Sequence, residues 1–167
     1  MSIYPFILEM KKLLRSLDGC IDKAVAHASA KKFDPNVLVQ ARLAPDQFAF
    51  VRQVQATCDQ AKFAASRLAG KEPPSHPDTE QTMDELKKRI ATVVSYLDTF
   101  SEKDFAGVGD RTVTTPRWEG KSMTAINYFV EHSQPNFYFH LTTAYAILRH
   151  NGVDIGKRDY IGQLTWR

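Results

Sequence analysis

Four long stretches of the chain place apolar residues three and four positions apart, which is the pattern of an amphipathic helix. They cover about residues 3–32, 44–70, 79–97 and 124–150. The last stretch is interrupted at Pro135, because a proline inside a helix removes a backbone donor. Four helices of this length, joined by connections that allow up-and-down packing or one long crossover, predict an all-α four-helix bundle.

The connections between these stretches carry their own signals. Pro35 ends the first helix, and a short helical turn is expected at residues 36–41. The linker at residues 71–80 contains three prolines and cannot be helical throughout. Between residues 101 and 122, turn-forming residues surround the β-branched segment RTVTTPRW. That composition predicts a short β-hairpin or an extended excursion that turns at residues 119–120.

Length and composition are those of an ordinary globular protein. The 167 residues suit one domain over residues 1–167, with 43% hydrophobic and 25% charged residues. The net charge of +3 is spread along the chain, so no nucleic-acid partner is expected. No stretch approaches the roughly 20 apolar residues of a membrane span. Glu9 and Lys11 interrupt the early apolar run, which argues against a secretory signal.

The chain has two cysteines, Cys20 and Cys58, and they form neither a CxxC pair nor a disulfide framework. This usage fits a reducing compartment and predicts a cytoplasmic protein. Both cysteines stand among residues of helical period, so we expect small buried hydrophobic side chains rather than reactive thiols.

Candidate chemistry gathers in the last helix. His132, Asn136 and His140 are spaced four and four, which places them on one face of a helix. Imidazole nitrogen suits zinc, nickel or iron, but His132 and His140 lie roughly 12 Å apart along a helix axis. Gln53, one turn before Thr57 on the second helix, could add an amide oxygen facing this group. The alternative to a metal site is a structural role, in which a histidine and an amide form hydrogen bonds inside the bundle.

An aromatic run follows on the same helix. Phe137, Tyr138, Phe139 and Tyr145 are typical of a core or a subunit interface, and less often line a ligand. The nucleotide-binding glycine patterns, the nucleophile elbow and the HExxH motif are all absent from the sequence. Their absence argues against the common nucleotide-dependent enzymes.

Two blocks, residues 38–70 (LVQARLAPDQFAFVRQVQATCDQAKFAASRLAG) and 135–162 (PNFYFHLTTAYAILRHNGVDIGKRDYIG), resemble an uncharacterised bacterial family of unknown function within the DinB/YfiT-like superfamily of metal-binding bundles. The resemblance covers essentially the whole chain. It implies an up-down-down-up bundle, often dimeric, with a divalent metal held by three histidines. One ligand comes from the second helix, and two ligands one turn apart come from the fourth. Better-known members of the superfamily include thiol-dependent transferases and a mycothiol-dependent isomerase.

The resemblance also assigns positions. His140 stands where the last histidine of the superfamily is expected, Asn136 where the other histidine of that helix is expected, and Gln53 is nearest to the ligand of the second helix. The chain therefore keeps one of three imidazoles.

Three functional hypotheses follow. The first is a degenerate metal pocket, lined by Gln53, Asn136, His140 and His132, that binds a small molecule. The alternative is a metal-dependent thiol transferase or hydrolase that acts on a small electrophile, with His140, Asn136 and Gln53 as ligands of zinc, nickel or iron. The third is an interaction or stress-response protein whose surface does the work. A homodimer is expected, and whether the protein is an enzyme is left open.

Overall fold

Four long helices form the body of this computed structural model, which describes residues 2–166. They are α1 (Tyr4–Lys31), α2 (Phe50–Leu68), α3 (Met83–Leu97) and α5 (Gln134–His150). α1 matches its expected stretch to within one residue at each end, and α2, α3 and α5 end within two residues of the expected ends. The helix count is higher than the four expected, because short helices occupy several of the connections.

The shorter elements lie mostly at the ends of the long helices. Two are α-helices, α4 (Ala125–Asn127) and α6 (Lys157–Ile161), and two are strands, β1 (Thr112–Thr114) and β2 (Ser122–Thr124). The remainder are four 3₁₀ turns and one π-helical stretch: Pro35–Gln40, Glu102–Phe105, Val108–Asp110, Pro116–Trp118 and, as the π-helix, Tyr128–Ser133.

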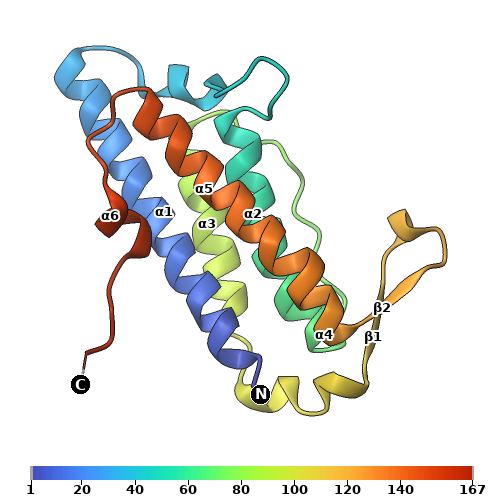
Figure 1. The fold of residues 1–167 in the computed structure, drawn as a ribbon. Coiled ribbons are helices and arrows are strands. Elements are labelled where there is room, and N and C mark those ends of the chain that lie inside the picture. The colour runs from blue at the N-terminus through green and yellow to red at the C-terminus, as the bar shows by residue number, and fades with distance from the viewer. Residues whose placement is uncertain (1, 167) are drawn as a thin grey trace.

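The long helices lie side by side around a common core. Figure 1 shows α1 and α5 running in one direction and α2 and α3 in the other, with the linker of residues 71–82 returning along the length of the body. Each of α1 and α2 contacts both α3 and α5. The short helix α6 then lies against α1. The long linker is what allows α2 and α3 to be parallel neighbours.

The core follows from the apolar faces of the four helices. Phe50, Phe137 and Leu14 are fully buried, at 0% exposure each. Small residues on α2, such as Ala61 and Ala65, are also at 0% and let the neighbouring helices approach closely. No helix among residues 2–166 is long and apolar enough to cross a membrane.

Two helix starts differ from expectation. The second helix begins at Phe50 and not at 44–46, because the Phe50 N–H donates to the carbonyl of Ala41 (2.9 Å) and the residues between them form turns. The third begins at Met83, four residues after the expected Thr79. Thr82 is its N-cap and forms a reciprocal capping box with Glu85, which satisfies backbone donors at the helix start.

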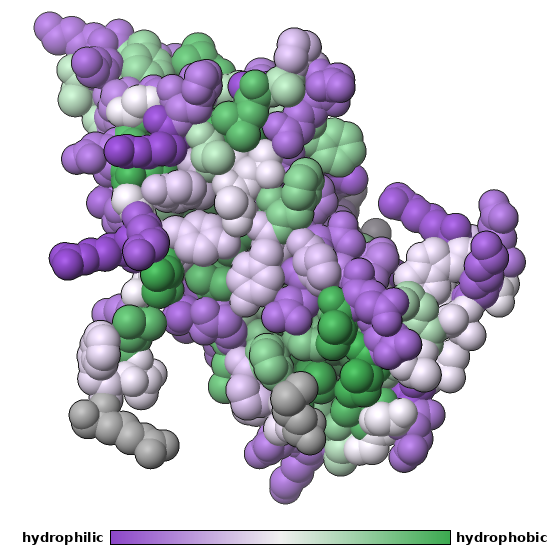
Figure 2. Space-filling model, in the orientation of Figure 1, coloured by the Kyte–Doolittle hydropathy of each residue, from purple (hydrophilic) through white to green (hydrophobic). Residues whose placement is uncertain are grey.

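The expected hairpin is present. β1 and β2 pair antiparallel with Val113 opposite Met123. Between the strands, the 3₁₀ turn Pro116–Trp118 is followed by Glu119 and Gly120, both with positive φ. The hairpin stands out from one side of the helical body in Figures 1 and 2. On the face shown in Figure 2, apolar side chains gather near α4 and the hairpin, and the surface is more hydrophilic towards the other end.

Candidate functional site

A cleft of about 490 Å³ opens between α2, the turn of the hairpin and the beginning of α5. Its size is within the range of small-molecule sites. Three of the four candidate residues, His132, Asn136 and His140, line it. The fourth, Gln53, is fully buried behind the wall and reaches the site through His140.

The helix that carries the three lining residues has a wide turn in its middle. The π-helical stretch Tyr128–Ser133 connects α4 to α5 without a break in the helical path. Pro135 explains the local disturbance, because it has no N–H and its ring crowds the carbonyl four residues earlier. π-helical turns are frequent at functional sites. Here the stretch sets the position of His132 in the cleft wall.

His140 and Gln53 form a directed hydrogen-bonded pair. His140 Nδ1 lies 2.8 Å from Gln53 Oε1, and Gln53 Nε2 donates to the carbonyl of Phe48 at 3.2 Å. Because the second bond makes the amide nitrogen a donor, Oε1 is the acceptor, and His140 donates from Nδ1. Burial lowers the pKa of His140, and Arg52 lowers it further. The neutral ring therefore has Nε2 as its unprotonated nitrogen.

Asn136 and His132 make different contacts. Asn136 Nδ2 donates to the carbonyl of His132 at 2.6 Å, so the amide is engaged within its own helix. The His132 ring stacks on Tyr128 (5.5 Å between centroids) and meets the edge of Trp118 (5.6 Å). Burial lowers the pKa of His132, with a further contribution from Arg67. Its buried Nδ1 has no partner among residues 2–166.

A second set of residues on α2 was missed from the sequence. Arg52, Asp59, Phe63 and Arg67 all line the cleft. Their spacing of seven, four and four is itself helical, so α2 carries a stripe of three charged residues and Phe63 beside its apolar one. This periodicity is visible in the sequence. It is typical of a solvent-exposed helix face, and only the structure shows that the hairpin turn and the linker lie beside it.

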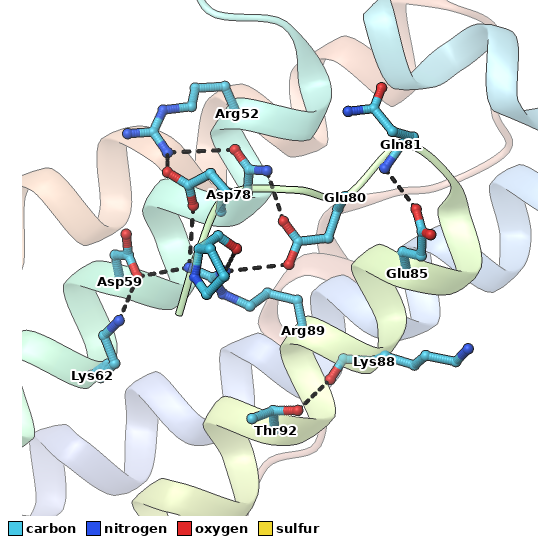
Figure 3. Close-up of polar contacts among 12 residues, drawn as sticks. Arg52, Asp59, Lys62, Asp78, Glu80, Gln81, Glu85, Lys88, Arg89 and Thr92 are labelled. Atoms are coloured by element: carbon cyan, nitrogen blue, oxygen red, sulfur yellow. Dashed lines mark hydrogen bonds and ion pairs between the residues drawn. The ribbon is translucent and has the colours of Figure 1, made fainter. Parts of the chain in front are cut away.

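The cleft is supported from behind by a buried ion-pair network around Arg89 of α3 (Figure 3). Arg89 Nη2 lies 2.9 Å from Asp59 of α2 and 3.3 Å from Asp78 of the linker, and Nη1 lies 3.2 Å from Glu80. Lys62 also pairs with Asp59, at 2.9 Å. The proline-rich linker has little apolar surface to bury, so these pairs hold it against α2 and α3.

Comparison with known sequences decides the family. Residues 5–161 match the family described as "Domain of unknown function (DUF1993)". The chain belongs to the DUF1993 family. A crystal structure of a DinB family member protein from Shewanella denitrificans superposes on this DUF1993 chain with a TM-score of 0.92 and 48% sequence identity. The alignment covers 96% of this chain and 92% of that one. No match was found among curated proteins.

This DUF1993 chain does not fit the three-histidine metal site that its superfamily resemblance implies. The corresponding residues supply one imidazole and two amides, and amide oxygen is a poor ligand for zinc, nickel or iron. Gln53 and Asn136 are engaged with His140 and a backbone carbonyl. Among residues 2–166, no three His, Cys, Asp or Glu residues are grouped so that they could hold a metal.

Proposed function

We propose that the protein binds a small organic molecule directly in the cleft, through its own side chains and without a metal ion. The fold is then an up-down-down-up bundle of the DinB type in which the former metal position has become a hydrogen-bonded wall. The observation that carries the proposal is a cleft of about 490 Å³ whose lining residues include Gln60 and His132, each of which has a buried polar atom, Oε1 and Nδ1 respectively, without a partner among residues 2–166. Such atoms are costly unless something satisfies them.

The metal-dependent thiol transferase or hydrolase has less support. It needs donors that can converge on one ion, and the Gln53–His140 bond directs both side chains towards each other. The chain's own thiols are also poor nucleophiles, because burial raises the pKa of Cys20 to about 11 and that of Cys58 to about 12.

The tryptophans offer a direct test. Trp118 lines the cleft, whereas Trp166 in the C-terminal tail is 83% exposed. The variant Trp166→Phe keeps a fluorophore in the cleft, and the matched control Trp118→Phe keeps only the tail fluorophore. We expect at least one compound of a mixed small-molecule library to change the Trp118 emission saturably and to leave the Trp166 emission unaltered.

The proposal would be refuted if no compound changed the Trp118 emission saturably and the NMR shifts of the backbone amides around the cleft also stayed unaltered. An effect of equal size in both variants would indicate non-specific quenching.

The expected homodimer and the single domain over residues 1–167 stay predictions. Light scattering on the eluted protein measures the mass of the assembly directly. A mass close to twice the 18.9 kDa of one chain is the expected result.

A further inference from the structure

The charges around the cleft do not cancel. Three guanidinium groups line it, from Arg52, Arg67 and Arg117, against two carboxylates, from Asp59 and Asp78. Basic groups that include Arg52 already hold these carboxylates. Asp59 pairs with Arg89 and Lys62, and Asp78 pairs with Arg89 and Arg52.

Among residues 2–166, two of the three arginines are left without an acidic partner. Neither Arg67 nor Arg117 forms an ion pair within the part of the chain that the structure describes. They come from different elements, Arg67 from the last turns of α2 and Arg117 from the exposed 3₁₀ turn of the hairpin. Two different elements therefore contribute unpaired positive charge to the lining of the cleft.

Arg67 is held in place by aromatic rings. Its guanidinium lies 4.4 Å from the centroid of Phe63 and 5.7 Å from that of Tyr128. It also donates from Nη1 to the hydroxyl of Tyr128 at 3.1 Å. A guanidinium that is fixed in this way loses little side-chain entropy when it binds a planar oxyanion, and its remaining N–H groups can donate in pairs.

The rest of the cleft combines aromatic surface with a few polar atoms. Trp118 and Phe48 are among its lining residues, and Phe48 is 51% exposed. Trp118 sits against the rings of Tyr128 and His132. An inorganic ion would leave this surface in water, whereas a molecule with an apolar ring would cover it.

We infer that the ligand of this cleft is a small organic oxyanion, a carboxylate or a phosphate monoester with an aromatic or apolar body. Arg67 and Arg117 bind the anionic group, and Trp118 and Phe48 cover the body. This inference rests on the proposed function, since it names the class of molecule that the cleft takes.

The experiment titrates four probes into Trp166→Phe at constant ionic strength and follows the emission of Trp118. Benzoate and phenyl phosphate carry the two anionic groups, benzamide is the uncharged analogue of benzoate, and inorganic phosphate lacks the body. We expect benzoate or phenyl phosphate to bind at least about tenfold more tightly than benzamide and inorganic phosphate, because a charge-assisted contact is lost in one case and apolar burial in the other.

Arginine variants in the same background locate the anion. Arg67→Gln and Arg117→Gln should each weaken binding of the preferred probe at least about tenfold, whereas the matched control Arg158→Gln on α6 should leave it unchanged. Arg117 is exposed, so its variant keeps the fold even if Arg67→Gln, which loses ring contacts, does not. Circular dichroism verifies folding in each case.

The outcomes separate the two proposals. Equal affinity for benzamide and benzoate, or equal affinity in Arg117→Gln and Arg158→Gln, overturns the oxyanion inference and leaves a cleft that binds another class of small molecule. Binding of inorganic phosphate as tight as that of phenyl phosphate overturns the aromatic body. No response to the four probes, alongside saturable binding of an uncharged library compound, also overturns only the inference. No response to any compound overturns both.

Discussion

Removal of the Arg89 side chain is the perturbation whose size the structure defines best. The side chain is 3% exposed and reaches three carboxylates, those of Asp59, Asp78 and Glu80. It also donates to the carbonyl of Pro77 at 3.0 Å. In Arg89→Ala, Glu80 and Asp59, whose side chains are 11% and 17% exposed, would lose their shared cation.

The expected loss is considerable. Breaking a buried ion pair by removing one partner costs about 3–5 kcal/mol, because the other charge remains uncompensated. Asp59 retains Lys62 and Asp78 retains Arg52, so we place the loss at the lower end, about 3 kcal/mol. For a chain of this length, that corresponds to a fall in Tm of roughly 6–12 °C.

Urea unfolding of the purified variant measures this loss, and Lys88→Ala is the matched control. Lys88 lies on the same helix and is exposed, so its removal should stay within about 0.5 kcal/mol of the native chain. The linker of residues 71–82 should also be cut faster by a protease in Arg89→Ala, because its anchoring ion pairs are gone. A destabilisation below about 1 kcal/mol would contradict this expectation, since it would mean that the network contributes no more than exposed pairs do.

Three further predictions concern other parts of the molecule. Burial lowers the pKa of His132 and His140 below 6.5, so the native state binds fewer protons than the unfolded chain. The urea concentration at the unfolding midpoint should therefore decrease as the pH is lowered from about 7.5 to about 5.5, and an increase would contradict this. The thiols of Cys20 and Cys58 should react with a disulfide reagent only after unfolding, and rapid labelling of the native protein would contradict their burial. Replacing Thr82 with alanine should cost about 0.5–2 kcal/mol in urea unfolding and replacing it with serine much less, because serine keeps the cap; equal losses would argue against the capping box.

Much of the helical architecture could be predicted from local patterns. The apolar period of residues 3–32 predicts α1, and the turn-forming residues before Ser122 predict the hairpin. The start of α2 could not be predicted, because the Phe50–Ala41 hydrogen bond competes with the helix-starting signal of Pro45. The π-helical stretch could not be predicted either, since it depends on the backbone conformation that the whole helix adopts around Pro135.

The candidate site was predicted only in part. His132, Asn136 and His140, whose spacing predicts one face of a helix, all line the cleft. Nothing in the sequence indicates that Arg117 lines the same cleft as Arg67, which lies 50 positions earlier in the chain and on another element. Contacts between distant segments depend on the path of the hairpin, and local periodicity contains no information about that path.

In the proposed function the cleft binds its ligand directly, and the Gln53–His140 pair is part of the cleft wall and not a metal site. Elemental analysis of the purified protein distinguishes these two roles of the pair. Protein without an affinity tag is exposed to zinc, nickel or iron and then desalted, and the variant His140→Ala is treated in parallel. We expect the same low metal content in both proteins. Stoichiometric metal in the native chain that is lost in His140→Ala would contradict it and would restore the metal-dependent hypothesis.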